Sequence, residues 1–419
     1  MAEKELRAVL VGANFTSGNY GTSDEDSISE LIGLLETAGG HCAAYVIQSR
    51  PVPDSATFIG SGKAQEIAEL AVSEEAGLIV FDNELQPTHI RNLEKIIGVR
   101  VLDRSMLILD IFAMRAKTKE GKLQTELAQY KYLLPRLTAS KGELSRLGGG
   151  IGTRGPGESK LETDRRHIRE RVRAIEEEIK DSARTRDLQR EGRKKGGIPI
   201  IAIIGYTNAG KSTLFNLLTQ ESVLAEDKLF ATLDPVTRKI EISEGMPVLV
   251  TDTVGFIKKL PHHLIRAFKS TLEEIKYADV LLHVVDAASP FYSEHIKVSQ
   301  ELIGQLGASE IPSITVFNKC DMADISEIAS GLDTVCISAK TGEGMAALLD
   351  AVTTALSAGK KEIRLIIPYT DYAFVDYVHK NADIISERHL ENAVELVILA
   401  EPQVYGRLKT YIPEAGDGV

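Results

Sequence analysis

The most specific spacing of chemically useful residues lies in Gly205–Ser212, which fits the pattern G-x-x-x-x-G-K-[ST]. A short β-branched run, Ile198–Ile204, precedes it and is typical of a buried parallel strand, and an amphipathic helical stretch follows. The glycines let backbone N–H groups turn inward around an anion, and the helix N-terminus adds partial positive charge. The sequence therefore predicts a phosphate-binding loop formed by Gly205, Tyr206, Thr207, Asn208, Ala209, Gly210, Lys211, Ser212 and Thr213.

Further residues are of the types that hold the end of a bound triphosphate. Lys211 is expected to reach the β- and γ-phosphates and Ser212 to ligate Mg²⁺. Thr232, in the segment Phe230–Pro235, can close over the metal and the γ-phosphate, and we include Phe230 among the nucleotide contacts. Asp252 follows a strand and suits a metal-bound water, and the Gly255 N–H can meet the γ-phosphate. The sequence thus predicts Mg²⁺ as a cofactor.

A second group of motifs reads the base. Asn318-Lys319-Cys320-Asp321 follows the strand-like run Ser313–Phe317, and Ser338-Ala339-Lys340 follows another such run. The Asp321 carboxylate can accept both N1–H and N2–H₂ of guanine, and adenine offers no such pair of donors. Asn318 can hold the loop and contact the base, the Lys319 stem can cover the ring, and the Ala339 N–H can meet guanine O6. These residues, in this order, predict a guanine-nucleotide site.

The elements that must position these residues indicate an α/β protein of several domains. In residues 1–114, short apolar runs alternate with helical windows, which predicts an open parallel α/β subdomain. Residues 198–358 are predicted to form a Ras-like phosphate-loop GTPase domain. Residues 359–419 are predicted to form a small α+β domain, with strands Glu362–Ile367 and Val394–Ala400, a helix Ala373–Lys380 and a candidate helix Gln403–Lys409.

The first subdomain carries one further glycine-rich turn, Gly60-Ser61-Gly62-Lys63, ahead of a helical window. It lacks the full phosphate-loop spacing. It can be a second nucleotide site or a plain turn at the start of a helix. Asp103 is expected to cap the helix that follows it.

Residues 115–191 change to heptad spacing and predict an antiparallel helical hairpin. Its apolar positions are Leu123, Leu127, Tyr130, Leu134 and Leu137, and then Leu161, Ile168, Val172, Ile175 and Ile179. A glycine-rich loop, Gly148–Gly157, joins the two helices, and residues 192–197 are predicted to be a basic linker. The loop is either a probe tip for structured RNA or a flexible hairpin end.

Charge is unevenly distributed along the chain. The 419 residues carry a net charge of −11, but residues 115–195 hold 22 Lys and Arg against 13 Asp and Glu. This asymmetry is typical of a local RNA- or phosphate-facing element, and a solvated, ion-paired helical face is the alternative. Our candidates for RNA contact are Arg146, Arg154, Lys160, Arg165 and Arg166.

Composition argues against several classes of protein. Three scattered cysteines form no CxxC pair, which argues against a zinc site or a disulfide framework. No apolar run is long enough to span a membrane, and the N-terminus does not resemble a signal peptide. We expect a cytoplasmic monomer.

The chain resembles the HflX family of translational GTPases over nearly its full length. The resemblance lies in Ser61–Ile67, Phe81–Pro87, Asp103–Ser105, Thr118–Gln124, Leu134–Arg136 and Gly148–Glu158, and in Gly205–Thr213, Phe230–Pro235 and Asp252–Ile257. It implies GTP hydrolysis coupled to binding of the large ribosomal subunit and its ribosomal RNA, and rescue of stalled ribosomes by splitting. It also implies that the glycine loop points toward the peptidyl-transferase region.

Two residues refine this expectation. Phe256 occupies the position of the water-orienting glutamine of the Ras-like pattern, and a phenyl ring cannot hydrogen-bond the attacking water. We therefore assign no catalytic residue and expect slow intrinsic hydrolysis that the ribosome stimulates. Asn208 resembles the asparagine that ligates K⁺ in some related GTPases, so K⁺ is a second candidate cofactor; otherwise Asn208 only shapes the loop.

Two other functions remain open from the sequence. One is a GTPase of ribosome assembly or tRNA modification, although signals for a modification domain are missing. The other is a nucleotide-gated binding module in which hydrolysis is incidental, which Phe256 keeps open. Turnover in the presence of ribosomes and K⁺ distinguishes the module from the enzyme.

Overall fold

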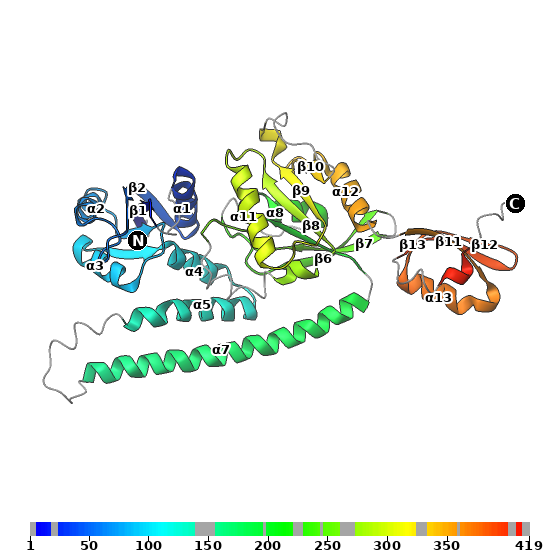
Figure 1. The fold of residues 1–419 in the computed structure, drawn as a ribbon, viewed down its shortest axis with the longest axis horizontal. Coiled ribbons are helices and arrows are strands. Elements are labelled where there is room, and N and C mark those ends of the chain that lie inside the picture. Colours follow the sequence, from blue (N-terminus) through cyan, green and yellow to red (C-terminus); the bar gives the residue numbers. More distant parts are fainter. Residues whose placement is uncertain are drawn as a thin grey trace.

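The computed structural model describes residues 6–17, 24–138, 156–195, 198–220, 229–243, 246–259, 273–323, 333–357, 361–400 and 408–412. Figure 1 shows three bodies in chain order, with a long helical hairpin lying along the first two. Each body is built on its own sheet. Among the described residues, no helix has the length and apolar character needed to cross a membrane.

The first body is an open parallel sheet in the order β2-β1-β3-β4. Helices connect the strands, as parallel pairing requires. Asp103 caps α4 as expected, because its carboxylate accepts the Met106 N–H at 3.0 Å. The elements are β1 (Leu6–Phe15), α1 (Glu25–Thr37), β2 (Gly40–Arg50), α2 (Ser61–Ser73), β3 (Leu78–Phe81), α3 (Pro87–Ile97), β4 (Arg100–Asp103) and α4 (Arg104–Arg115).

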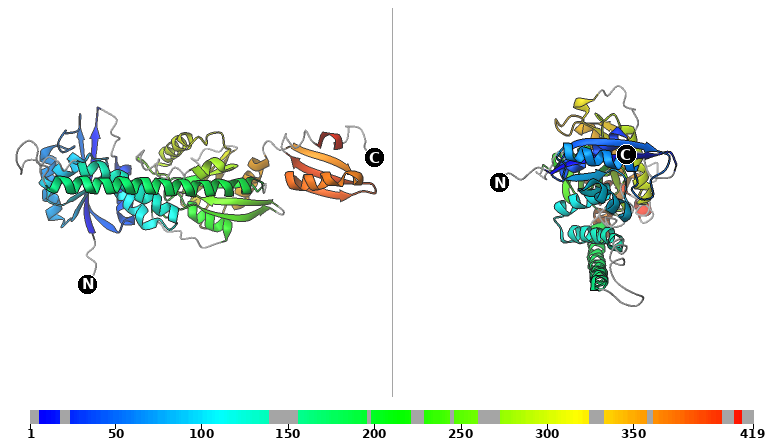
Figure 2. Two further views of the ribbon diagram at one scale, coloured as in Figure 1. Left: turned by 90° about the horizontal axis from the view of Figure 1, so that it is seen from below. Right: turned by 90° about the vertical axis from the view of Figure 1, so that its left-hand side faces the viewer.

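The hairpin consists of α5 (Lys119–Thr138) and α7 (Pro156–Lys195). Leu123, Leu127 and Ile175 form its buried seam, with Tyr130, Val172 and Ile179 packed beside them. Figure 2 shows α7 running along the first body as far as the second. Helix α7 is longer at both ends than the sequence predicts: Pro156 and Gly157 of the predicted loop, and residues 192–195 of the predicted linker, are helical. Proline suits the first turn of a helix because its missing N–H is not needed there.

The second body has a six-stranded sheet in the order β10-β9-β8-β5-β7-β6, and only the β6–β7 pair is antiparallel. The predicted phosphate loop follows β5, in the middle of this sheet. The elements are β5 (Ile200–Gly205), α8 (Lys211–Thr219), β6 (Val236–Ser243), β7 (Met246–Asp252), the 3-10 helix η1 (Glu273–Tyr277), β8 (Val280–Asp286), α11 (Tyr292–Gln305), β9 (Ser313–Asn318), the 3-10 helix η2 (Cys320–Met322), β10 (Thr334–Cys336) and α12 (Met345–Ser357).

The third body is a three-stranded antiparallel sheet, β11-β13-β12, with α13 packed on one face. Strand β12 is not predicted from the sequence, because its residues are mostly polar and exposed. Among the described residues it pairs with β13 alone. Most of the candidate helix Gln403–Lys409 lies outside the described residues. The elements are β11 (Lys361–Pro368), η4 (Tyr369–Asp371), α13 (Tyr372–Asn381), β12 (Asp383–His389), β13 (Ala393–Ala400) and η5 (Lys409–Tyr411).

One hydrophobic core is shared by the first two bodies. It joins Leu34 and Phe112 of the first body to Phe230, Phe256 and Leu281 of the second, all 3% exposed or less. The rings of Phe112 and Phe230 meet edge to face, with centroids 4.7 Å apart. Burial of this apolar surface therefore holds the second body against the first.

Candidate nucleotide-binding site

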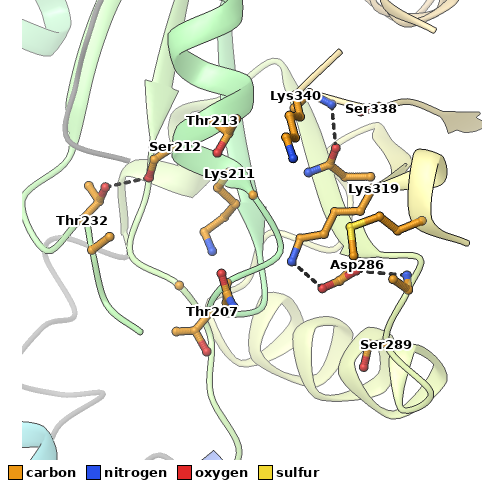
Figure 3. A pocket seen from close by; sticks show the side chains of 18 of the residues that line it. Thr207, Lys211, Ser212, Thr213, Thr232, Asp286, Ser289, Lys319, Ser338 and Lys340 are labelled. Carbon is orange, nitrogen blue, oxygen red and sulfur yellow. Dashed lines mark hydrogen bonds and ion pairs between the residues drawn. The ribbon is translucent and has the colours of Figure 1, made fainter. Parts of the chain in front are cut away.

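A cavity of about 640 Å³ opens at the carboxyl ends of the strands of the second sheet. This is where ligands bind in open α/β sheets. The side chains around it come from the phosphate loop, from the end of β8 and from the two predicted base-reading loops (Figure 3). Predicted residues that line it are Thr207, Asn208, Gly210, Lys211, Ser212, Thr213, Phe230, Thr232, Gly255, Asn318, Lys319, Asp321, Ser338, Ala339 and Lys340.

The phosphate loop requires glycine at two places. Gly205 has φ +141°, and a Cβ there would lie 2.1 Å from the Val284 carbonyl oxygen. Gly210 has φ +91°, and a Cβ there would lie 2.2 Å from Asn318 Nδ2. Asn208 also adopts a positive φ, +62°, which asparagine tolerates better than most residues. This backbone explains why the motif has glycine at positions 205 and 210.

Lys211 is buried at the start of α8, with a side chain that is 6% exposed overall. Its Nζ donates to the Tyr206 carbonyl at 2.6 Å. Burial lowers the pKa of Lys211 to about 8, and the charge of Asp252 opposes part of that shift. A phosphate in the cavity would add negative charge to that of Asp252 beside this ammonium group.

Three of the predicted metal-site oxygens converge beside Lys211. Ser212 Oγ and Thr232 Oγ1 each donate to Asp252 Oδ2 at 2.9 Å, and the two hydroxyls lie 2.9 Å apart. The other carboxylate oxygen, Asp252 Oδ1, is buried with no hydrogen-bond partner among the described residues. Burial raises the pKa of Asp252, and the Lys211 charge and the hydroxyl donors oppose that change. Hard oxygen donors of this kind fit Mg²⁺.

Gly255 lies against the phosphate loop. A Cβ on it would lie 2.7 Å from Thr207 Cγ2 and 2.9 Å from Lys211 Nζ. The next residue, Phe256, donates its N–H to the Gly205 carbonyl at 3.0 Å and accepts the Thr207 N–H at 2.7 Å. Its ring is 1% exposed and packs in the shared core. The structure thus gives Phe256 a packing role that the sequence analysis did not foresee.

At the base end of the cavity, Asn318 links two loops. Its Nδ2 donates to the Ala209 carbonyl at 2.8 Å, and its Oδ1 accepts the Ala339 N–H at 2.9 Å. The sequence predicts that the Ala339 N–H meets guanine O6, whereas in the structure this N–H donates to Asn318. Asp321, on the short helix η2, lines the same end.

Asp286 is a functional candidate that sequence reasoning missed. Its carboxylate pairs with Lys319 Nζ at 2.7 Å and fixes the stem that is expected to cover the base (Figure 3). Asp286 ends β8, just as Asp252 ends β7. The rule that placed Asp252, a carboxylate at a strand end, could have found Asp286 as well.

Four predicted residues, Gly205, Tyr206, Ala209 and Asp252, do not line this cavity. Tyr206 points to the first body instead: its hydroxyl donates to Glu30 of α1, and its ring stacks on His295 with centroids 3.8 Å apart. Burial and the Glu30 charge raise the pKa of Tyr206, so it stays a neutral donor. Tyr206 therefore serves the contact between bodies rather than the cavity.

The candidate RNA contacts are only partly visible. Arg146 and Arg154 lie outside the described residues, and Lys160 is described only as part of the helix backbone of α7. Within α7, Arg165 pairs with Glu162 at 3.4 Å and Arg166 pairs with Glu170 at 3.9 Å. Such pairs are typical of a solvated helical face. RNA contact by these residues stays a prediction.

The turn at Gly60–Lys63 fits the start of a helix. Gly60 precedes α2, its N–H donates to Gln48 Oε1 at 3.0 Å, and Lys63 Nζ pairs with Glu66 at 2.7 Å. These contacts favour the plain turn over a second nucleotide site. Among the described residues, no group of three or more His, Cys, Asp and Glu side chains could hold a metal ion.

The chain matches three family descriptions in sequence order: "GTP-binding GTPase N-terminal" over residues 25–113, "GTP-binding GTPase Middle Region" over 115–193 and "50S ribosome-binding GTPase" over 200–319. It is 46% identical over 412 residues to GTPase HflX of Caldanaerobacter subterraneus subsp. tengcongensis, covering 98% of this chain and 95% of the relative. It is 43% identical over 368 residues to GTPase HflX of Escherichia coli, covering 86% and 85%.

Among solved structures, a complex of SsGBP with GDP is 26% identical to this chain, with a TM-score of 0.48. The match covers 84% of this chain and 98% of that one.

Proposed function

The chain belongs to the HflX family of GTPases and is a GTP-hydrolysing enzyme. From this premise, we propose that the cavity at residues 205–213 binds GTP with Mg²⁺ and that the nucleotide state controls binding to the large ribosomal subunit. The observation that carries the proposal is the meeting of Ser212, Thr232 and Asp252 beside Lys211, with Asp321 at the far end of the same cavity. One end thus fits a metal-bound triphosphate and the other fits guanine.

Each group has a separate task in this proposal. The phosphate-loop N–H groups and Lys211 bind the β- and γ-phosphates, while Ser212 and Thr232 would hold Mg²⁺ directly and Asp252 through a water. A bound Mg²⁺ would neutralise charge on the phosphate oxygens. The Gly255 N–H would meet the γ-phosphate, so the segment that follows it senses whether that phosphate is present.

Hydrolysis needs a group that orients the attacking water, and Phe256 cannot supply one because its ring is apolar and buried. We propose that the intrinsic rate is low and that ribosome contact completes the site. K⁺ held by Asn208 is the second proposed source of help, since positive charge near the transferred phosphoryl group stabilises the transition state. Asn208 lines the cavity, which is compatible with that role.

The family description that residues 200–319 match names the 50S ribosome. We propose the large ribosomal subunit as the partner of this chain too. The basic hairpin, with its glycine-rich loop, is the proposed contact with ribosomal RNA. Splitting or rescue of stalled ribosomes is the proposed outcome. A cytoplasmic, monomeric protein is part of the same proposal.

The decisive experiment measures GTP turnover by the purified chain with and without large subunits, in K⁺ and in Na⁺. We expect turnover to rise at least tenfold with large subunits, and further in K⁺ if Asn208 holds the ion. Negligible turnover in every condition would instead support the nucleotide-gated binding module. Arg154→Ala tests the predicted RNA contact and should weaken binding to the subunit without changing GDP affinity.

A second experiment separates splitting from assembly. Intact ribosomes are incubated with the chain and a non-hydrolysable GTP analogue and are then resolved by sedimentation. Separated subunits support splitting, whereas binding to free large subunits alone supports the assembly alternative. Repeating the binding at several salt concentrations measures the phosphate contacts, because each neutralised phosphate adds to the salt dependence.

A further inference from the structure

Two segments next to the proposed γ-phosphate site are fixed by residues of the first body and the hairpin. The first switch segment is residues 230–235, which include Thr232. The second switch segment is residues 255–259. Both pack in the core that the first two bodies share. Their position therefore depends on contacts outside the nucleotide cavity.

The first switch segment is fixed by Asp234. Its Oδ2 accepts the backbone N–H groups of Lys117 and Thr118, each at 2.8 Å, and its Oδ1 accepts the Thr118 hydroxyl at 2.5 Å. These donors lie just before α5, so the carboxylate also sits at the positive end of a helix. Space is tight here, since a Cβ on Gly121 would lie 2.3 Å from Asp234 Oδ1.

The second switch segment is fixed by a buried polar network. The Lys258 N–H donates to the Tyr206 hydroxyl at 2.8 Å, and that hydroxyl donates to Glu30. Glu30 pairs with Arg104, which also donates to the Lys258 carbonyl at 3.2 Å. Both are at least nine-tenths buried, with exposed fractions of 7% for the Glu30 side chain and 2% for that of Arg104.

The lysine side chains of the same segment add two ion pairs across the contact. Lys258 Nζ pairs with Asp26, and Lys259 Nζ pairs with Asp82, whose side chain is fully buried. Buried pairs of this kind fix geometry, because breaking one leaves an uncompensated charge. The segment after Gly255 is thus held by four residues of the first body, Asp26, Glu30, Asp82 and Arg104.

With these contacts in place, both switch segments lie next to the position proposed for the γ-phosphate. Thr232 Oγ1 is 2.9 Å from Ser212 Oγ and 2.9 Å from Asp252 Oδ2, and Gly255 lies against Lys211. GDP has no γ-phosphate to meet the Gly255 N–H, so it gains less from these positions than GTP does. The docked arrangement should therefore bind GTP more tightly than it binds GDP. Such a difference in affinity is what couples docking to the choice of nucleotide.

We propose that Asp234, Asp26 and Glu30 are positioning residues through which docking of the first body and of the start of the hairpin raises the affinity for GTP relative to GDP. This rests on the proposed function, since it assumes that the cavity binds guanine nucleotides. By reciprocity, GTP tightens the docking of the first body and GDP does not. The first body is then the element that reads which nucleotide is bound.

The test measures the affinity of the full-length chain for GDP and for a non-hydrolysable GTP analogue with Mg²⁺. We expect Asp234→Ala to weaken analogue binding about tenfold, within the usual range of such couplings, and to change GDP binding less than twofold. Asp54→Ala is the matched control: Asp54 also accepts two backbone N–H groups and a threonine hydroxyl, but in a turn between β2 and α2. It should change neither affinity.

A second pair of variants tests the other switch segment. Asp26→Asn removes one of the two carboxylate charges that pair with Lys258, the other being Glu294 of the second body. Glu25→Gln removes a neighbouring exposed charge from the same turn of α1. Only Asp26→Asn should lower the ratio of analogue to GDP affinity. Hydrogen exchange gives an independent readout: the Lys117 and Thr118 amides should exchange more slowly with the analogue than with GDP.

Other outcomes contradict the inference in distinguishable ways. Equal weakening of both nucleotides by Asp234→Ala would mean that the contacts only support the fold. Tighter binding of the analogue would mean that the first body holds the switch segments away from GTP. An unchanged ratio in both variants also overturns the inference, whereas failure of the wild-type chain to bind either nucleotide overturns the proposed function itself.

Discussion

Asn318 shows how one side chain organises a site at the scale of the residue. Its amide joins the phosphate loop to the loop that carries Ala339, through hydrogen bonds of 2.8 and 2.9 Å. The side chain is 2% exposed, so neither bond competes with water. The phosphate end and the base end of the cavity are consequently held at a fixed separation, which suits a ligand of fixed length.

Base selectivity is predicted to depend on Asp321. In Asp321→Asn, an amide donor replaces one carboxylate acceptor, so it no longer accepts both N1–H and N2–H₂ of guanine. The amide instead matches the 2-carbonyl of xanthine. We expect GDP affinity to fall at least 100-fold, consistent with the loss of hydrogen bonds to a charged group, and xanthosine diphosphate affinity to rise. Competition between the two nucleotides measures their relative affinities. Unchanged selectivity would mean that Asp321 does not contact the base.

His283 gives the protein a predicted sensitivity to acid. Burial in β8 lowers the pKa of His283 to about 4, with the Lys211 charge adding to the effect. The unfolded chain protonates this histidine near its ordinary value, so its contribution to stability is complete above about pH 6.5 and is lost as the pH falls toward 4. Between pH 7.5 and 5 we expect a loss of about 2 kcal/mol from this group.

The measurement compares wild type with His283→Gln in urea, following hydrogen exchange of the β8 amides. The substitution removes the titrating group, so the stability of the variant should depend less on pH over the same interval. If both proteins lose the same stability between pH 7.5 and 5, His283 is not the source.

At the scale of the element, the hairpin of α5 and α7 has a narrow apolar seam. Ile175 is fully buried against Leu123 and Leu127, and ion pairs flank the seam: Arg171 with Glu126 at 2.8 Å and Lys131 with Glu176 at 2.8 Å. These pairs are exposed and contribute little. The seam therefore supplies most of the stability of the contact between α5 and α7.

Ile175→Ala is predicted to loosen the hairpin alone. Removing this side chain leaves a cavity in the seam, at a cost of about 2–5 kcal/mol. Amides of α5 and α7 should exchange faster, whereas those of β5 and β8 should not change. The exposed neighbour Arg173→Ala is the control, and it should leave exchange in both helices as it is in wild type. Faster exchange throughout the second body would mean that the hairpin is not an independent element.

At the scale of the whole molecule, the bodies are joined unequally. The first two share one core, but the core of the third, built around Ile363, Leu365 and Leu396, contains no residue of the others. Figure 1 shows the third body at the far end of the second, away from the first. None of the described residues of the third body lines the nucleotide cavity.

A chain that ends at Ser357 is therefore predicted to bind GDP within twofold of the full-length chain. A chain that begins at Ile198 should behave differently, because it exposes Phe230 and Phe256 to water. We expect that second truncation to aggregate or to lose stability by several kcal/mol. Binding and thermal unfolding of the two chains check this, and equal behaviour would contradict the shared core.

The sequence alone determined much of this protein because its nucleotide motifs are local. A strand followed by a glycine loop or a carboxylate fixes its own backbone, and parallel strands bring their carboxyl ends to one edge. Lys211, Ser212 and Asp321 could therefore be assigned to one cavity from spacing alone. The alternation of short apolar runs likewise determined the parallel sheet of the first body.

Only the tertiary structure decided how the bodies meet. No spacing in the sequence links Asp234 to Thr118, or Tyr206 to Glu30, because those partners are brought together by burial of apolar surface between bodies. The outward turn of Tyr206 and the burial of Phe256 have the same origin. The pairing of Asp286 with Lys319 depends instead on the parallel pairing of β8 with β9, which brings the ends of these strands together. Long-range packing has no period along the chain, so these contacts became visible only in the folded molecule.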